Sequence, residues 1–511
     1  MALVNFLSPI FGGILLATPF LYPPLYVLTW VALLPLFWVI RRSTSNREAF
    51  LFGWTMGITI NLVGFYWLIY TIRVFGGYSY GVSAIIFLLF ALYSGLPLGF
   101  FSLLVWRCGL GPLSLFPPLF WVAIEFWFPL LFPWHLANSQ ATFLSLIQSA
   151  DLVGPYGTSF LLVWANTVLL KIAEAFLSHQ GGRKIPLREA AIVAVALLGV
   201  LFYGNLKLRA ISAEMKAAKS LTLAVVQGNI SIRKKGEISY MESNLESYID
   251  LTKKIRGSTL VIWPESAVDA WLPDRLKQLP PELFPEGVPT TSFLLFGVRS
   301  FLRDPTVPGL TAFNSAFLVD GQGSVLSRYH KQVLLAFGEY IPFSAVLSRL
   351  PGMPPMGSGF TSGDGPRTLD ISPTIKLAPL ICYEDLIPRL SRRFVGESDA
   401  TLLVNLTNDA WFGNTAAPWQ HARLAKWRAI ETRRTLVRAT NTGLTTVINP
   451  RGEILETLPT FSSGVLTADV PLMKGQTLYV RFGDWFAWMT TIASLAILIL
   501  RWRRHRERPE R

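Results

Sequence analysis

Long apolar runs fill the first two hundred positions of this chain, and each is about as long as a helix needs to cross a bilayer, roughly 20 residues. The bilayer core offers the backbone no water, so such runs fold as helices whose N–H and C=O groups bond within the segment. The composition agrees, because 51% of the 511 residues are hydrophobic and only 15% are charged, against roughly 25% charged in average soluble domains. We expect eight spans, at about 3–20, 23–40, 50–72, 82–106, 113–132, 157–175, 189–204 and 483–500.

The spans divide the chain into three parts. The first run has the position of a secretory signal, but it opens with Met1-Ala2-Leu3-Val4, lacks a basic segment and is followed almost at once by another apolar run. We therefore expect a retained helix there. The prediction is a membrane domain at 1–204 with seven transmembrane helices, a water-soluble domain at 205–481, and a last transmembrane helix with a basic tail at 482–511.

The net charge of +14 is concentrated at the ends of alternate spans. Lys and Arg cluster after the second and fourth spans, between the sixth and seventh, and in the tail, whereas none occurs from Cys108 to Leu170. Because cytoplasmic connections carry such an excess of basic residues, we expect both termini in the cytoplasm and residues 205–481 on the outer side. No nucleic-acid partner is expected, since nucleic-acid binding gathers basic residues on one face of a soluble domain.

The chain has two cysteines, Cys108 and Cys382, which this topology puts on opposite sides of the membrane. We therefore expect no disulfide within the chain and no zinc site of several thiolates; the five His do not cluster either, so no metal or other cofactor is expected. A single cysteine is commonly just a small buried apolar side chain. A lone thiol on the oxidising side, however, risks oxidation and disulfide exchange, which makes Cys382 a candidate for chemistry.

From Leu221 onward, short strand-like runs replace the long apolar ones. Asp320-Gly-Gln-Gly323 predicts a hairpin, and apolar positions at helical spacing predict helices at 239–255 and about 418–435. Strands alternating with helices, together with hairpins, indicate a layered α/β domain whose sheet is not purely parallel. The strands are expected at 221–230, 258–263, 293–299, 313–319, 324–329, 375–381, 400–406, 445–448 and 453–458.

Three short strings in this domain supply a carboxylate, an amine and a thiol: Trp263-Pro264-Glu265-Ser266, His330-Lys331 and Ile381-Cys382-Tyr383-Glu384-Asp385. A thiol attacks a carbonyl group well only as the thiolate, so it needs a base or a cation nearby. Glu265 can take the proton, and the Lys331 ammonium can lower the thiol pKa and stabilise charge on the attacked oxygen. The first and third strings follow predicted strands, where catalytic side chains are often carried.

These strings resemble the Glu-Lys-Cys pattern of the nitrilase (carbon-nitrogen hydrolase) superfamily. Glu339 follows Lys331 by eight residues, and the strings at 405–413, 428–431 and 438–443 are similar to that superfamily's later signature. The flanking spans narrow the resemblance to the apolipoprotein N-acyltransferase family. The resemblance implies that the soluble domain is a four-layer α-β-β-α sandwich.

The resemblance also implies a two-step acyl transfer. Glu265 is expected to be the general base, and Cys382 the nucleophile that takes a fatty acyl group from a membrane phospholipid as a thioester. Lys331 is expected to stabilise the oxyanion. The α-amine of a diacylglyceryl-modified N-terminal Cys on an apolipoprotein would then receive the acyl group. The implied enzyme is a monomer in the bacterial inner membrane, with its catalytic domain on the periplasmic side.

Three supporting residues follow from the same resemblance. The Tyr383 backbone N–H is expected to share the oxyanion with Lys331, while its side chain shapes the acyl pocket. Glu339 and Glu384 are expected to orient Lys331 and the pocket. For both carboxylates an ordinary surface ion pair remains an alternative, because exposed pairs are common.

Two other functions remain open on the residues alone. A membrane-tethered hydrolase of nitriles or small amides would use the same triad, although it has no need of eight spans. A transporter would use the spans, but they contain no internal repeat or paired broken helices.

Three further features each allow two interpretations. Residues 343–367, rich in Gly and Pro, are either a lid over the site or a surface insertion. Glu125, inside the fifth span, is either a functional acid or a carboxylate that reaches water. In 231–237, where the family usually has a Trp, the basic residues at 233–235 are candidates for contact with lipid phosphate.

Overall fold

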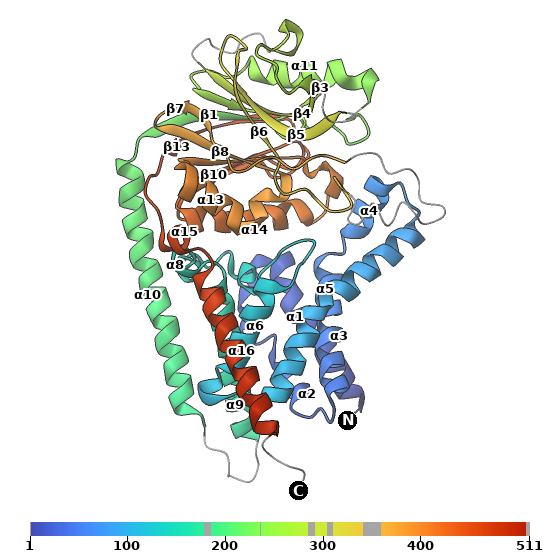
Figure 1. Cartoon of the computed structure of the whole chain (residues 1–511), viewed down its shortest axis with the longest axis vertical. Helices are drawn as coiled ribbons and strands as arrows, with labels where there is room; N and C mark the ends of the chain where they lie inside the picture. Colours follow the sequence, from blue (N-terminus) through green and yellow to red (C-terminus); the bar gives the residue numbers. More distant parts are fainter. Residues whose placement is uncertain are drawn as a thin grey trace. The chain divides into compact units, whose positions relative to one another are not determined.

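The computed structural model describes residues 2–177, 185–235, 237–284, 292–303, 310–340 and 359–506. These residues form two compact units (Figure 1). The helical unit contains Met1–Ala210 together with Phe482–Arg511, and the α/β unit contains Ile211–Arg481.

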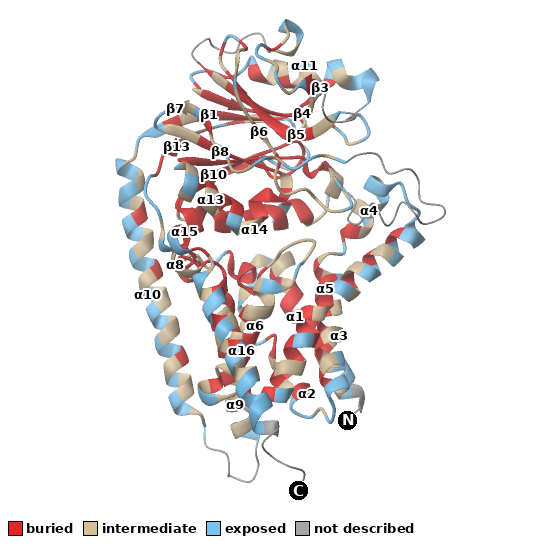
Figure 2. Cartoon of the chain, viewed as in Figure 1, coloured by how far each residue is buried: buried red, intermediate tan, exposed pale blue. Residues whose placement is uncertain are grey.

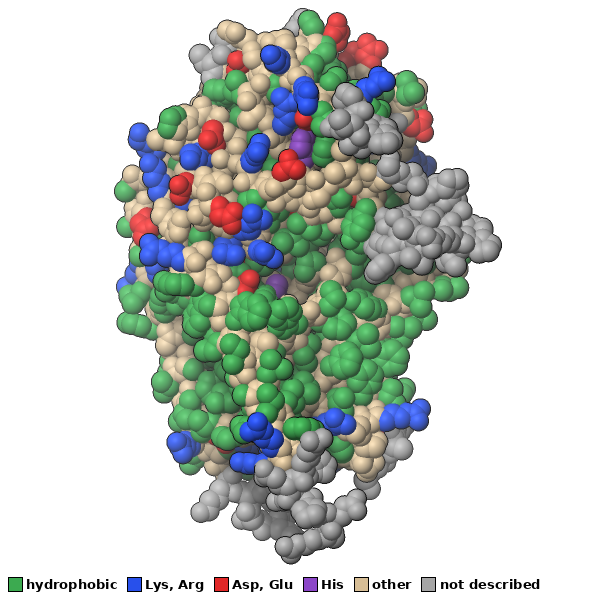
Figure 3. All heavy atoms as spheres, viewed as in Figure 1, with side chains coloured by type: hydrophobic (Ala, Val, Ile, Leu, Met, Phe, Trp, Pro, Cys, Tyr) green, Lys and Arg blue, Asp and Glu red, His purple; other side chains and the backbone are tan. Residues whose placement is uncertain are grey.

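Apolar helices make up the helical unit. They are α1 Ala2–Leu21, η1 Pro23–Trp30, α2 Leu34–Ile40, α3 Asn46–Gly64, α4 Leu68–Gly76, α5 Tyr80–Cys108, η2 Pro112–Ser114, α6 Phe116–Trp127, η3 Leu136–Gln140, α7 Leu144–Ile147, α8 Ala150–Val153, α9 Tyr156–Leu177, α10 Leu187–Ala217 and α16 Trp485–Arg506. On the face drawn in Figure 3, hydrophobic side chains cover most of this unit, as expected of helices that face lipid.

By length and composition, fewer of the described helices could cross a membrane than the eight spans predicted. Among the described residues, six helices are long and apolar enough to cross a membrane, or up to seven if a bent pair is one span. The bent pair is α3 and α4, which meet at 66° within the run predicted as one span at 50–72. α6, in the span predicted at 113–132, is a shorter apolar helix. Several membrane-compatible helices are therefore present, and the count of eight stays a prediction.

In the helical unit, α3 packs closely on α5. A Cβ atom added at Gly95 would lie 2.8 Å from the backbone nitrogen of Ile58, so only glycine fits there. Across the same pair of helices, Trp54 Nε1 donates to the Leu92 carbonyl oxygen at 2.7 Å. Small residues and interhelical hydrogen bonds hold helices together where no hydrophobic gain is available, as in lipid.

Two β-sheets form the centre of the α/β unit. The seven-stranded sheet has the order β13-β1-β2-β4-β5-β6, with β3 paired to β4, and the six-stranded sheet has the order β12-β11-β10-β9-β8-β7. The pairs β1–β2 and β2–β4 in the first sheet and β8–β9 and β9–β10 in the second are parallel, while β5–β6 is an antiparallel hairpin closed at Asp320–Gly323. The strands are β1 Ser220–Gln227, β2 Leu260–Ile262, β3 Val268–Pro273, β4 Phe293–Leu302, β5 Thr311–Val319, β6 Val325–His330, β7 Leu369–Ser372, β8 Ile375–Ile381, β9 Leu402–Thr407, β10 Thr435–Thr440, β11 Thr446–Ile448, β12 Ile454–Thr457 and β13 Gly464–Pro471.

The sheets pack face to face, with helices on the outer faces. One buried core joins Leu223 and Leu295 of the first sheet to Leu403 and Leu436 of the second. On the other face of the first sheet, Tyr248 of α11 (Met241–Thr252) packs with Trp263. Two helices, α13 (Pro388–Ser398) and α14 (Ala417–Thr432), cover the second sheet. The layers α11, sheet, sheet and α13 with α14 are visible in Figure 1, and Figure 2 shows their buried centre. This is the α-β-β-α order that the resemblance implies.

Several strands were not predicted from the sequence. β10 lies inside the stretch assigned to the end of a helix and the loop after it; Arg433, in the left-handed region at φ 51°, ends α14, and β10 begins two residues later. Every residue of this strand is buried, but polar residues such as Arg438 interrupt the apolar run by which a buried strand is predicted from sequence. β3, β7 and β13 were missed as well. In β13 the signal was present, since Leu466, Ala468 and Val470 alternate with exposed polar residues.

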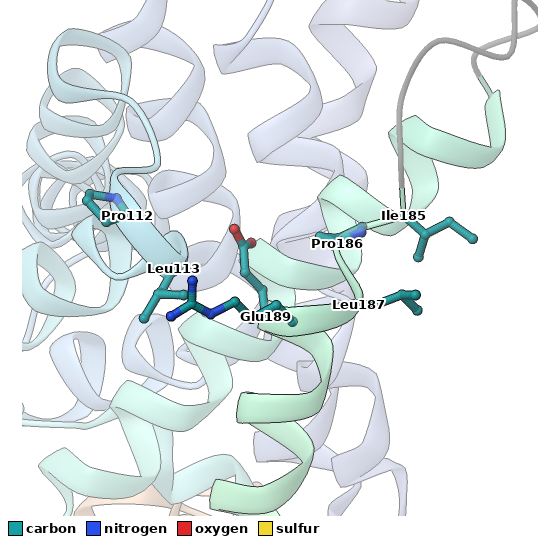
Figure 4. A pocket seen from close by; sticks show the side chains of 7 residues that line it. Pro112, Leu113, Ile185, Pro186, Leu187 and Glu189 are labelled. Carbon is teal, nitrogen blue, oxygen red and sulfur yellow. The ribbon is translucent and has the colours of Figure 1, made fainter.

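The helical unit also contains a cavity of about 620 Å³ (Figure 4). Its lining comes from Pro112 and Leu113 and from residues 185–189. Glu189 in this lining pairs with Lys171, at 2.9 Å between Oε2 and Nζ. None of the residues predicted for catalysis contributes to it.

Candidate active site

Glu265 lies just after β2, at the carboxyl end of a parallel strand. The next residue, Ser266, has φ 49°, so the chain turns sharply there. Gly297 of β4 allows this turn to press against the sheet, since an added Cβ would lie 2.6 Å from the Glu265 Cα and from the Ser266 nitrogen. Residues held at unfavourable backbone angles cost roughly 1–3 kcal/mol each and are concentrated at functional sites.

Cys382 lies in the same relation to β8, as the first residue of the 3-10 turn η6 (Cys382–Leu386). Its φ of 55° is again left-handed. The side chain of Asn405, on the neighbouring strand β9, donates to the carbonyl oxygens of Leu380 at 3.1 Å and Cys382 at 2.8 Å. The turn that carries the thiol is therefore fixed to the strand beside it.

Lys331 follows β6 and is 1% exposed. Its ammonium nitrogen lies 2.7 Å from Glu339 Oε2, and that same oxygen accepts a hydrogen bond from the Leu335 N–H at 2.8 Å. The Lys331 N–H donates to the Asn314 carbonyl oxygen at 2.8 Å. Glu339 thus pairs with the buried ammonium and is itself held by the main chain of the same loop.

One amide group links the two carboxylates on this side of the site. Asn314 Nδ2 donates to Glu265 Oε1 at 2.8 Å and to Glu339 Oε1 at 2.9 Å. The other oxygen of Glu265 accepts from the Asn408 N–H at 3.0 Å. Glu265 and Lys331 are therefore connected through Asn314 and Glu339, which fixes both side chains without a direct bond between them.

Glu384 is fully buried and joins the lysine segment to the thiol turn. Its carboxylate accepts from the backbone N–H groups of Gln332, Val333 and Ile381 at 2.7–2.9 Å, and from the Tyr329 hydroxyl at 3.0 Å. Ile381 directly precedes Cys382, and Gln332 and Val333 directly follow Lys331. Burial raises the pKa of Glu384 to about 7, against the opposing effects of Lys331 and of the three backbone donors. The surface ion pair considered for Glu384 is therefore wrong, and so is the one for Glu339, whose partner Lys331 is buried.

Tyr383 completes the group. Its hydroxyl donates to the Leu334 carbonyl oxygen at 2.8 Å, and the Lys331 ammonium lies 5.4 Å from the centre of its ring. The ring is buried. The fold therefore brings together all six residues predicted from the sequence, from three segments of the chain: the turn after β2, the segment after β6 and the turn η6.

Burial and charge set the protonation chemistry of this group. Burial raises the pKa of the Cys382 thiol, the Glu265 carboxylate raises it further, and Lys331 opposes both. For Lys331, burial favours the neutral amine, but a thiolate at Cys382 together with Glu339 and Glu265 outweighs it and raises the pKa. Burial also raises the pKa of Glu265, against the effects of Lys331 and Asn314. A resting thiol beside a carboxylate and a firmly protonated amine is suited to base-assisted attack.

A second buried cluster lies next to the thiol turn and was not predicted. His421 of α14 contacts Asp385 through Nε2 at 2.9 Å and Asp409 through Nδ1 at 3.0 Å. Arg438 of β10 pairs with Asp385 and lies 3.7 Å from Asp409. Asp385 belongs to the turn of Cys382, and Asp409 follows the Asn408 that binds Glu265. The sequence strings at 405–413 and 438–443, which resemble the superfamily's signature, contain Asp409 and Arg438. The sequence did not predict that these two side chains lie in one buried cluster.

Part of the segment predicted as a lid or an insertion, 341–358, lies outside the described residues. The part that follows runs beside the lysine: the Gly363 N–H donates to the Lys331 carbonyl oxygen at 2.9 Å, and Ser362 Oγ donates to that of Gln332 at 2.6 Å. The Phe360 ring stacks on Trp271 with 6.1 Å between centroids. Both interpretations of the segment stay open.

Glu125, in the helical unit, is engaged in hydrogen bonds. Its Oε1 accepts from the Leu136 N–H at 2.7 Å and from Trp121 Nε1 and Ser159 Oγ, both at 3.1 Å. The carboxylate thus ties α6 to η3 and α9. Among the described residues no group of three or more His, Cys, Asp and Glu is arranged to hold a metal ion.

Two family models match the chain. Residues 12–168 match the apolipoprotein N-acyltransferase N-terminal domain, and residues 222–478 match the carbon-nitrogen hydrolase domain. An apolipoprotein N-acyltransferase of Geobacter metallireducens is 33% identical over 98% of this chain and 96% of its own length. The chain belongs to the apolipoprotein N-acyltransferase family. Similar relatives of the same name occur in Azotobacter vinelandii, 33% identical over 94% of this chain and 90% of that protein, and in Bdellovibrio bacteriovorus, 30% identical over 97% and 93%.

The family assignment combines the two units. The first model falls in the helical unit and the second in the α/β unit, so the acyltransferase family is defined by both parts of the chain. A hydrolase of the superfamily needs only the second. The family therefore favours the acyltransferase over the tethered hydrolase.

Proposed function

We propose that this enzyme moves a fatty acyl group from a membrane phospholipid, through a thioester on Cys382, to the α-amine of the N-terminal diacylglyceryl-Cys of apolipoproteins. The observation that carries the proposal is the hydrogen-bonded chain Glu265–Asn314–Glu339–Lys331. It fixes a base and a cation around the thiol turn in a member of an acyltransferase family.

The first half-reaction begins with a protonated thiol, because the pKa of Cys382 is raised. Glu265 accepts the thiol proton as the sulfur attacks the ester carbonyl carbon. The oxygen that becomes negative is stabilised by the Lys331 ammonium and the Tyr383 N–H. When the tetrahedral intermediate collapses, the carbon–oxygen bond breaks, and the leaving alkoxide of the lysophospholipid takes the proton back from Glu265.

The second half-reaction uses the same groups. The acceptor α-amine attacks the thioester carbonyl carbon, Glu265 takes the amine proton, and Lys331 again stabilises the oxyanion. Collapse forms the amide and breaks the carbon–sulfur bond, and the thiolate regains its proton from Glu265. Water must be kept out between the two steps, because it would hydrolyse the thioester.

The membrane placement belongs to the same proposal. The alternation of Lys- and Arg-rich connections supports eight spans with both termini in the cytoplasm. The catalytic unit, 205–481, then lies on the periplasmic side of the bacterial inner membrane, where both lipid-anchored substrates meet the enzyme in one plane. We propose that the enzyme works as a monomer without nucleic acid or cofactor, since the six residues of the site come from a single chain.

Intact mass measurement tests the first half-reaction. The purified protein is incubated with phospholipid of defined acyl chains and without acceptor, alongside Cys382→Ala. We expect a mass increase of one acyl group that hydroxylamine removes and that is absent in the variant. An unchanged mass, or an adduct that persists in Cys382→Ala, would overturn the thioester.

A further inference from the structure

The three basic residues at 233–235 differ sharply in their surroundings. Arg233 and Lys234 are exposed, and the Lys234 ammonium lies 5.4 Å from the centre of the Tyr240 ring. Lys235 is instead directed inward. Its Nζ donates to the main-chain carbonyl oxygen of Glu265 at 3.0 Å. The shared role in lipid phosphate contact considered from the sequence therefore does not fit Lys235.

The position of Lys235 is fixed by contacts on both sides. Asn244 of α11 donates to the Lys234 carbonyl oxygen at 3.2 Å and to Asp269 Oδ2 at 3.1 Å, so it ties the turn to β3. Arg299 of β4 donates to the Asp269 carbonyl oxygen at 3.2 Å. The ammonium thus lies in a built site, among Asp269, Arg299 and the Glu265 turn.

This contact is on the side of Glu265 away from the chemistry. The carboxylate oxygens are engaged by Asn314 and Asn408, and the backbone oxygen is engaged by Lys235. The next residue, Ser266, has the left-handed φ of 49°. A cation bound to the carbonyl oxygen holds this turn and adds positive charge close to the carboxylate, without occupying the oxygens that must take a proton.

We propose that Lys235 is a positioning residue for the general base, holding the Glu265 turn and keeping its carboxylate ionised. The inference rests on the proposed role of Glu265.

The charges that face these groups agree with the proposal. Burial raises the pKa of Glu265; Lys331 and Lys235 lower it, and Glu339 raises it. Burial lowers the pKa of Lys235 to about 8, against the opposing effects of Asp269 and Glu265, while Arg299 lowers it further. Lys235 is therefore charged below pH 8, where its effect on Glu265 is greatest, and neutral above that pH.

Lys235→Met in the full-length enzyme tests the inference, because Met keeps the length of the side chain without the charge. The rate of thioester formation from phospholipid is measured by intact mass between pH 5 and pH 9. We expect the acid limb of the rate profile to move upward by roughly one pH unit, and the rates of the variant and the wild-type to approach each other above pH 8. In Lys235→Arg, which keeps the charge, the acid limb should lie close to its wild-type pH. In Lys234→Met, whose substitution is one residue away on the exposed side, the acid limb should not move.

The outcomes separate the inference from the proposed function. If the wild-type enzyme forms no thioester, the proposed function itself fails. If it does, and Lys235→Met has the wild-type acid limb, the inference is wrong. A raised KM for phospholipid with an unmoved limb would also overturn it and would assign Lys235 to phosphate binding. If Lys235→Met fails to fold, Lys235→Gln replaces it, because Gln also lacks the charge but can still donate to the Glu265 carbonyl oxygen; a wild-type acid limb in that variant would overturn the inference.

Discussion

Two buried charged clusters lie side by side in the α/β unit, and they differ in how their charges are satisfied. In the cluster of Asp385, Asp409, His421 and Arg438, each carboxylate lies against a ring nitrogen of His421 and beside the guanidinium of Arg438. The cluster of Glu265, Glu339 and Lys331 has two carboxylates for one ammonium and a thiol beside them.

This difference separates a structural role from a chemical one. The first cluster links the turn of Cys382 to the loop of Asn408, α14 and β10. In the second cluster the proposed base, Glu265, can accept a proton from Cys382, and the transfer leaves the total charge unchanged. We therefore expect mutations in the first to reduce stability and mutations in the second to reduce rate.

Glu265→Gln should give the largest effect of all. It removes the base but keeps the shape and the hydrogen bond from Asn408, so the rate of thioester formation should fall by about 10²–10⁴-fold. The thermal unfolding midpoint should fall only modestly, because the loss is confined to one hydrogen bond: the amide nitrogen of Gln cannot accept from Asn314 Nδ2 as Glu265 Oε1 does. The two measurements are single-turnover mass spectrometry and a thermal melt in detergent. A Glu265→Gln enzyme that keeps the wild-type rate of thioester formation, or that loses it only because it unfolds, would contradict a chemical role for this cluster.

Arg438→Met should show the opposite pattern. It leaves Asp385 and Asp409 buried with one cation fewer, and breaking a buried ion pair costs about 3–5 kcal/mol of unfolding free energy. The melting midpoint and the yield of folded protein should both fall. Arg393→Met is the matched control, since Arg393 pairs with Glu397 on the outer surface of α13 and such pairs contribute about 1 kcal/mol or less. Equal effects of the two substitutions would contradict the assignment.

Gly297→Ala should affect both properties to a smaller extent. The new methyl group would meet the backbone of Pro264, Glu265 and Ser266, which cannot move aside as a flexible side chain would. Overpacking of this kind costs about 1–3 kcal/mol, and displacement of Glu265 should lower the rate as well. Gly464→Ala is the control, because its nearest neighbours would lie 3.5 and 3.7 Å away. A Gly297→Ala enzyme with full rate would imply that the Glu265 turn tolerates movement.

The smallest expected effect is in the pH dependence of the wild-type enzyme. Glu265 acts as a base only when ionised, and burial raises its pKa above the ordinary value of about 4.3. The rate of thioester formation should therefore be lost, as pH falls, at a higher pH than for an ordinary glutamate. A limb at or below about 4.3 would mean that another group is the base.

The sequence predicted the residues that lie where strands end, and missed those that lie within strands. Glu265 and Cys382 follow apolar runs that read clearly as β2 and β8, and the resemblance supplied Lys331, Glu339, Tyr383 and Glu384. Asn314 lies inside β5, and no pattern in the sequence indicates that its side chain reaches the site, because a polar residue in a strand usually faces water. Arg438, inside β10, belongs to the string at 438–443, but the string does not reveal which side chains it contacts.

Lys235 illustrates a different limit. Its two basic neighbours have the same local sequence character, yet the fold turns only Lys235 toward Glu265. The direction of a side chain in an irregular turn depends on contacts from distant parts of the chain, here Asn244 and Asp269. Periodicity carries no information about such contacts.

The proposed mechanism depends on transfer of the acyl group from the Cys382 thioester to an amine. The direct test is to form the acyl-enzyme on phospholipid, remove the lipid, and add a peptide with an N-terminal diacylglyceryl-Cys while following both masses. We expect the enzyme to lose one acyl group and the peptide to gain the same group on its α-amine. Release of free fatty acid with an unmodified peptide would contradict it, and would make the enzyme a hydrolase.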